Sequence, residues 1–258
     1  MKTIISTGLL CLLLGGCGVI NKARVPDEVP NWRIGYTMPS FYPVRVTKAY
    51  GINKTEDWTS ILHTHSQFMK VSDFKRVQEY LPNYDGYGLP LNLFTVSNYA
   101  QIKYTNHLPD KVVLYWTSLF DAKFYITELN VTPKMKALMY QKQNQVEADG
   151  IHRSCYQTTF DFGFLPNGQV KVYLKGCGKY TYITELSPTS TPETDYNGNS
   201  STAYKHDYEE ELSIRVKEAK VTLIPIPWGK VNKVYKSASL ILTYRLAGFC
   251  EAIKCIGI

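Results

Sequence analysis

The stretch that decides the fold is "CYQTTFDFGFLPNGQVKVYLKGC", residues 155–177. Apolar and polar residues alternate on both sides of Pro166-Asn167-Gly168. Such alternation is typical of strands with one buried face, and Asn-Gly between two of them is a strong signal for a hairpin turn. The stretch therefore predicts an antiparallel hairpin with Cys155 and Cys177 near its open end. A strict two-residue loop would misalign the cysteines by about three positions, so we expect a bulge or a longer loop.

The same alternation on both sides of the hairpin predicts a chain rich in β-strands. Residues 186–203 are rich in Pro, Ser and Thr, which predicts a long exposed loop. Beyond this loop, two short runs again alternate between apolar and polar residues. Residues 58–66 resemble a loop. Strands are expected at residues 32–36, 44–46, 93–104, 111–118, 123–130, 180–185, 212–216, 221–223 and 231–246.

One segment has a clear helical pattern. Thr132 suits an N-cap, Pro133 suits the first helical position, and apolar residues recur at helical spacing before Gly150. We therefore expect a helix near residues 133–149, and a second, weaker one over 72–80. The predicted fold class is β-rich α+β, with antiparallel, sandwich-like sheets and this helix.

The N-terminal segment has the pattern of a secretory signal. A lysine at position 2 precedes an apolar stretch of about 11 residues, which is too short to span a membrane. The stretch ends in Leu14-Gly15-Gly16-Cys17, which resembles the bacterial lipobox. This resemblance implies cleavage before Cys17, acylation of that residue and, because aspartate does not follow it, localisation to the outer membrane facing the periplasm. The expected organisation is a signal peptide at 1–16, a tether at 17–30 and a single β-rich domain at 31–258.

Six cysteines are present, of which Cys11 would leave with the signal peptide and Cys17 would carry lipid. An even number of remaining cysteines in an exported chain predicts disulfides, with three possible pairings. The hairpin favours the local pairing. The competing interpretation, a metal site, lacks a Cys-x-x-Cys pair. Disulfides are therefore expected among Cys155, Cys177, Cys250 and Cys255.

Composition and short motifs argue against several functions. The formal net charge of +7 is scattered along the chain, so nucleic acid is not an expected partner. The common motifs of hydrolases, nucleotide-binding proteins and calcium sites do not occur. His63 and His65 could form half of a metal site, but we interpret them as surface histidines. We expect no catalytic residue, cofactor or metal, and we interpret four scattered carboxylates as turn or cap residues: Asp57, Asp85, Asp121 and Asp161.

The densest candidate for a binding surface is "LPNYDGYGLPL", residues 81–91. Two tyrosines, two glycines and two prolines make a constrained loop that we expect to be exposed. Binding loops have a similar composition, although a plain wide turn between two elements would have it too. The candidate partner-binding residues are Tyr84, Asp85 and Tyr87.

Three segments resemble a bacterial lipoprotein family of unknown function. They are "NWRIGYTMPSFYPVRV" (31–46), "LPDKVVLYWTSLFDAKFYITELNVTPKMKALM" (108–139) and "FDFGFLPNGQVKVYLKG" (160–176). The resemblance covers residues 31–180. It also implies a neighbourhood, because genes of this kind often lie beside phospholipase effectors delivered by type VI secretion. Lipoproteins encoded there act as immunity proteins in the periplasm.

The leading hypothesis is therefore a non-enzymatic outer-membrane lipoprotein that acts as an immunity protein. Its expected partners are the membrane, through lipidated Cys17, and a periplasm-acting toxin, which the resemblance implies is a phospholipase. The alternative hypothesis is a structural or envelope-maintenance lipoprotein that binds components of the cell envelope. An exported hydrolase with an unrecognised site is the third.

Overall fold

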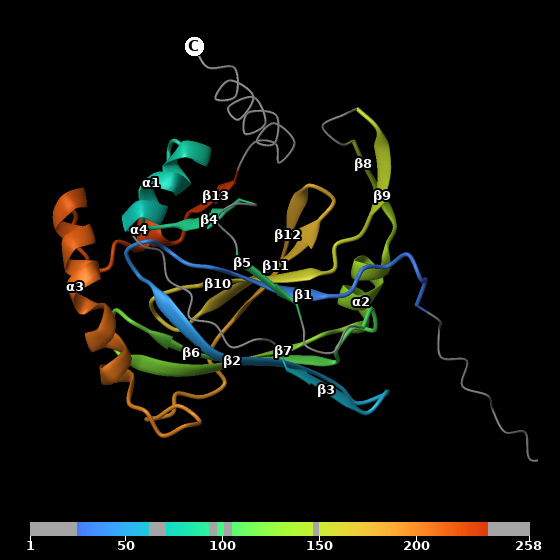
Figure 1. The fold of residues 1–258 in the computed structure, drawn as a ribbon, viewed down its shortest axis with the longest axis horizontal. Coiled ribbons are helices and arrows are strands. Elements are labelled where there is room, and N and C mark those ends of the chain that lie inside the picture. Colours follow the sequence, from blue (N-terminus) through green and yellow to red (C-terminus); the bar gives the residue numbers. More distant parts are fainter. Residues whose placement is uncertain (1–24, 62–70, 93–96, 101–104, 147–149, 237–258) are drawn as a thin grey trace, which may run out of the picture.

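The computed structural model describes residues 25–61, 71–92, 97–100, 105–146 and 150–236. Within these ranges, two large sheets pack around one core (Figure 1). The five-stranded sheet has the order β12 (Lys179–Leu186), β11 (Val170–Gly176), β10 (Thr159–Phe164), β1 (Arg33–Thr37) and β5 (Ser97–Ala100). The four-stranded sheet has the order β3 (Trp58–Ile61), β2 (Val44–Asn53), β6 (Lys111–Ser118) and β7 (Lys123–Asn130).

Smaller elements surround these two sheets. Two-stranded sheets are formed by β4 (Leu89–Leu91) with β13 (Val234–Lys236), and by β8 (Gln143–Val146) with β9 (His152–Cys155). The helices are α1 (Val71–Tyr80), α2 (Pro133–Tyr140), α3 (Ser201–Ala219) and α4 (Trp228–Val231). Strand pairing is antiparallel except between β1 and β10 and between β4 and β13. The predicted β-rich α+β class is therefore confirmed.

The hairpin predicted at residues 155–177 is formed by β10 and β11. Phe160 pairs with Leu174, and Phe164 pairs with Val170. Residues 165–169 connect the strands, so the loop is longer than two residues, as expected. Its Gly168 has a φ of +89°, and a Cβ atom there would lie 2.5 Å from the ring of Tyr125. Glycine is therefore required at this turn on both conformational and steric grounds.

The local disulfide pairing is confirmed. Cys155, at the end of β9, is bonded to Cys177, just after β11, and their Cα atoms are 5.3 Å apart. Their bond joins the small β8–β9 sheet to the five-stranded sheet. The other predicted pair, Cys250 and Cys255, lies outside the described residues.

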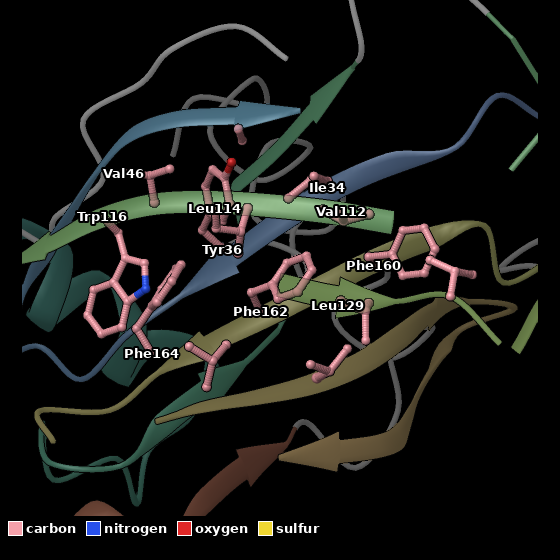
Figure 2. Packing of buried hydrophobic residues seen from close by; sticks show 14 of the residues in the cluster. Ile34, Tyr36, Val46, Val112, Leu114, Trp116, Leu129, Phe160, Phe162 and Phe164 are labelled. Carbon is pink, nitrogen blue, oxygen red and sulfur yellow. The ribbon is translucent and has the colours of Figure 1, made fainter. Parts of the chain in front are cut away.

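The core lies between the two large sheets. Figure 2 shows Phe160, Phe162 and Phe164 of β10 directed toward side chains of β6, among them Leu114 and Trp116. The Trp116 ring lies 4.7 Å from the ring of Phe164, and its Nε1 donates to Thr127 Oγ1 at 3.1 Å. Alternation along each strand thus directs every second side chain inward, which is why the period of two in the sequence located the sheets.

The structure confirms where α2 begins but not where it ends. Thr132 Oγ1 accepts from the backbone N–H of Met135, and Pro133 opens the helix. The helix stops at Tyr140 rather than near residue 149, because the apolar stripe lasts only two turns and residues 143–146 pair with β9 instead. The weaker prediction of a helix over 72–80 is confirmed by α1.

The strand predicted at 212–216 is wrong, because these residues belong to α3, the longest helix of the described chain. Ser200 caps α3 by accepting from Ala203 N–H, and Lys220 ends it in the left-handed conformation. Tyr208 and Arg215, seven positions apart, are the side chains that α3 buries, whereas Ile214 is exposed. The apparent period of two therefore did not correspond to one buried face. No strand forms at 221–223 either.

Several predicted boundaries change. Val25 and Val29 are buried against Tyr156, so residues 25–30 pack on the body and the tether does not extend to residue 30. Residues 58–61 form β3 rather than a loop, and within 231–246 the described strand is β13. Irregular chain over 187–200 agrees with the predicted exposed loop, and part of the predicted strand at 93–104 is β5. Residues 201–203 of the predicted loop instead begin α3. The parts of these predictions at 62–66, 93–96, 101–104 and 237–246 lie outside the described residues, as does Cys17. None of the helices in the described ranges is long and apolar enough to cross a membrane.

Replacing both Cys155 and Cys177 by Ser should lower the free energy of unfolding by about 3 kcal/mol, because the bond closes a loop of 22 residues in the unfolded chain. Urea unfolding of the oxidised protein and of the double variant would measure this difference. Adding a reductant should destabilise the wild type and leave the variant unchanged. Equal stability of the two oxidised proteins would contradict the prediction.

Candidate functional site

The predicted binding loop at residues 81–91 is not an exposed surface. Tyr84 is fully buried, its hydroxyl accepts from Ser40 N–H at 3.0 Å, and its ring packs against Phe74 and Tyr235. Tyr87 is also buried and donates its hydroxyl to Thr222 O at 2.9 Å. The aromatic rings that were expected to bind a partner therefore anchor the loop to the core.

Asp85 has a local role in the same loop. Its Oδ1 accepts from the backbone N–H of Tyr87 at 3.0 Å. This hydrogen bond fixes the turn that precedes β4. The carboxylate is partly exposed and acts as the predicted turn residue rather than as a contact for a partner.

The structure does not assemble a metal site from its described parts. His63 and His65 lie outside the described residues. Among the described residues, no group of three or more His, Cys, Asp or Glu side chains is placed to hold a metal ion.

Asp161 is the most unusual titratable group in the described chain. It was interpreted as a turn residue, but it lies inside β10, on the face opposite Phe160 and Phe162, and it is fully buried. Within the described residues, neither carboxylate oxygen has a hydrogen-bond partner. Burial raises the pKa of Asp161 to about 7, while the nearby ammonium group of Lys175 acts in the opposite direction. A buried carboxyl of this kind makes stability depend on pH.

The described chain has an open groove beside α3, with a volume of about 520 Å³. We name it the α3 groove. One wall is the side of α3 that carries Leu212 and Val216, and the other is formed by Leu119 and Phe120, just after β6, and by residues 223–224. The lining residues are Leu119, Phe120, Asp121, Lys205, Glu209, Leu212, Ser213, Val216, Leu223 and Ile224.

Apolar side chains make up most of the lining of this groove: Leu119, Phe120, Leu212, Val216, Leu223 and Ile224. Ile224 is 73% exposed. Isolated exposed apolar residues are common, but apolar side chains gathered at a groove mark a surface for binding. The α3 groove therefore replaces residues 81–91 as the candidate site.

Buried hydrogen bonds hold both walls of the α3 groove in place. Tyr42 donates its hydroxyl to Leu223 O at 2.8 Å, which fixes the wall opposite α3. Arg215 is 1% exposed, donates to Ser40 O and lies against the ring of Tyr208, which fixes α3. A site with such fixed walls binds with less loss of conformational entropy than a mobile one.

A second, smaller pocket has a structural explanation. Its volume is about 250 Å³, and it lies next to Asp195, Tyr204 and Arg45. The carboxylate of Asp195 accepts from Tyr204 Oη at 2.6 Å and from the backbone N–H of Asn199 at 2.8 Å. These hydrogen bonds lower the pKa of Asp195, although burial acts against them. The carboxylate therefore stabilises the loop that leads into α3.

Figure 1 shows where α3 lies relative to the start of the described chain. Helix α3 lies on one side of the body, and the blue segment that leads into β1 lies on the opposite side. The wall of the groove that α3 forms is therefore on the side opposite the segment where the predicted tether ends.

The family comparison covers both large sheets and the α3 groove. The matching family is described as a protein of unknown function (DUF2931), and the match spans residues 20–229. The chain belongs to the DUF2931 family. This DUF2931 match extends beyond the resemblance seen at residues 31–180 and includes all of α3. No curated protein and no solved structure matches the chain.

The sequence contained a signal for this site that the strand interpretation hid. Tyr208, Leu212 and Val216 recur at every fourth position, which is helical spacing. Ser200 precedes them as a good N-cap. The wall opposite α3 could not be inferred in the same way. Leu119 and Leu223 are about a hundred positions apart in the chain and are brought together only by folding.

Proposed function

We propose that this DUF2931 protein is an immunity lipoprotein that binds and neutralises a toxin acting in the periplasm, namely a phospholipase effector of type VI secretion. The observation that carries the proposal is the α3 groove, with its largely apolar lining and its exposed Ile224. An enzyme that removes acyl chains from a membrane must expose apolar surface around its active-site mouth, and an apolar groove is complementary to such a surface.

The proposed anchoring supports the same function. The lipobox resemblance implies lipid on Cys17, and helix α3, which forms one wall of the groove, lies on the side of the body opposite the segment where the predicted tether ends. An anchored protein would thus direct the groove away from its own point of attachment. Anchoring also concentrates the binder on the membrane that the toxin attacks, which raises its effective concentration.

The test is a rescue of growth. We expect wild-type protein, co-expressed with a periplasm-directed effector encoded by an adjacent gene, to restore growth that the effector alone abolishes. Purified effector should lose its phospholipase activity at an equimolar amount of this protein, since the mouth of the active site is covered. Absence of rescue with every adjacent effector, at confirmed expression of this chain, would refute the proposal.

A matched variant separates anchoring from binding. Cys17→Ser removes the thiol that would be acylated, so the protein should leave the membrane fraction and should rescue growth only at higher expression. Binding to the purified effector should remain unchanged, because the described lining of the groove comes from residues 119–121, 205–216 and 223–224. A Cys17→Ser protein that still carries lipid would contradict the assignment of the anchor.

A further inference from the structure

We propose that the α3 groove binds an amphipathic α-helix whose apolar stripe is flanked by Lys or Arg side chains. This inference rests on the proposed function, because the helix would belong to the toxin. Three features of the groove favour such a helix over other ligands: its length, the elements that line it and its charge.

The first observation is the length of the groove. Its lining residues on α3 run from Lys205 to Val216 and recur at spacings of one, three and four, so they follow one side of the helix. Eleven steps along an α-helix span about 16 Å. That length accommodates about three turns of a partner helix, enough for anchor side chains at positions i, i+4 and i+7.

The second observation is the type of element that lines the groove. Its walls come from helix α3, from residues 119–121 after β6, and from residues 223–224 before α4. None of the lining residues belongs to a β-strand of the described chain. An extended peptide needs a strand edge that offers free N–H and C=O groups, whereas a helix satisfies its own backbone and binds through side chains alone. The groove therefore suits a helix.

The third observation is charge. The chain has a formal net charge of +7, yet α3 carries five acidic residues against three basic ones, and one of the three is the buried Arg215. Glu209 and Asp121 lie in the lining of the groove, with Lys205 as its one cation. Basic side chains on the partner would complement these carboxylates.

The same charge argues against two other occupants. A second copy of this chain docked groove to groove would bring two acidic α3 helices together, which like-charge repulsion disfavours. A single acyl chain would gain nothing from the carboxylates at the open side of the groove. Sedimentation of the free protein would detect a second copy.

The probe is a stapled helical peptide of about four turns, with leucines along one stripe and lysines on both sides of it. We expect saturable binding to the full-length protein by fluorescence anisotropy. A peptide with the same leucines and with glutamates in place of lysines should bind at least about tenfold more weakly. Equal binding of the two peptides would overturn the charge argument, and absence of saturable binding by the lysine peptide would overturn the proposal.

Substitutions at two exposed positions test whether the peptide binds in the groove. Ile224→Asp should weaken peptide binding about tenfold, and Glu209→Lys about fivefold. Both side chains are well exposed, so neither change should disturb folding. The matched controls are Ile151→Asp, on an exposed isoleucine before β9, and Glu210→Lys, on a glutamate next in sequence that is not in the lining. If the controls weaken binding as much as the test variants do, the groove is not the site.

Growth rescue by the same variants, co-expressed with the toxin, distinguishes this inference from the proposed function. Wild-type rescue that Ile224→Asp and Glu209→Lys abolish would support both. Wild-type rescue that these variants leave intact would overturn the groove as the binding surface while the immunity function stands. Peptide binding without any rescue would instead refute immunity and leave the helix-binding groove. Sedimentation of the free protein as a dimer that Glu209→Lys strengthens would favour a second copy and overturn the proposal.

Discussion

Asp161→Asn is expected to raise the free energy of unfolding at pH 8 by about 4 kcal/mol. The carboxyl is fully buried, and its pKa rises from 3.8 to about 7 in the folded protein. Between these two values the unfolded chain releases the proton while the folded chain keeps it. Stability therefore falls as pH rises from about 4 to about 7 and is constant above that range as far as this group is concerned.

Urea unfolding at several pH values between 4 and 8 would measure the effect. Wild type should lose stability with rising pH, whereas Asp161→Asn should lose much less, because its side chain cannot ionise. Asp207→Asn, a change at an exposed carboxyl of α3, is the matched control and should retain the wild-type slope. If Asp161→Asn kept that slope as well, another group would be responsible for it.

Arg215→Ala is the second change with a large expected effect, a loss of about 4 kcal/mol. Its side chain is almost fully buried, donates to Ser40 O and lies 3.4 Å from the carboxylate of Glu211. Removing it leaves a cavity beneath α3 and takes a charged donor from a buried carbonyl. Because α3 is one wall of the groove, binding of the lysine peptide should weaken as well.

Thermal or urea unfolding would measure this loss. Two further variants show how much of it comes from lost hydrogen bonds and how much from removing any arginine. Arg215→Met retains most of the side-chain volume and removes the charge together with its hydrogen bonds, so we expect it to cost about 2 kcal/mol. Arg76→Ala removes an exposed arginine of α1 and should change stability by less than about 0.5 kcal/mol. An Arg215→Ala protein as stable as the Arg76→Ala protein would show that α3 is not held by this residue.

The sheets were predictable because their signals are local. Alternation over residues 159–164 and 170–176, together with the turn between them, requires no knowledge of the rest of the chain. The same holds for β6, β7 and the start of α2 at Thr132. The end of α2 was not predictable from Gly150, since residues 143–146 pair with β9 across the disulfide-bonded region.

The candidate site was not predictable to the same extent. Residues 81–91 have the composition of a binding loop, yet their tyrosines are buried. Tyr84 is hydrogen-bonded to Ser40, and Tyr87 is hydrogen-bonded to Thr222. Residues 212–216 alternate like a strand, but the N-cap at Ser200 and the burial of Tyr208 and Arg215 select a helix. In both regions contacts distant in sequence outweighed a short local pattern.

The sequence by itself determined the β-rich class, the hairpin at 155–177 and a lipobox-like N-terminus, and it favoured the pairing of Cys155 with Cys177, because each depends on neighbouring residues. Only the tertiary structure decided which aromatic residues are buried, that Asp161 lies fully buried within a strand, and that α3 forms a groove with residues 119–121 and 223–224. The physical reason is that burial and grooves depend on which distant segments pack together, and packing across a hundred residues leaves no periodic trace in the chain.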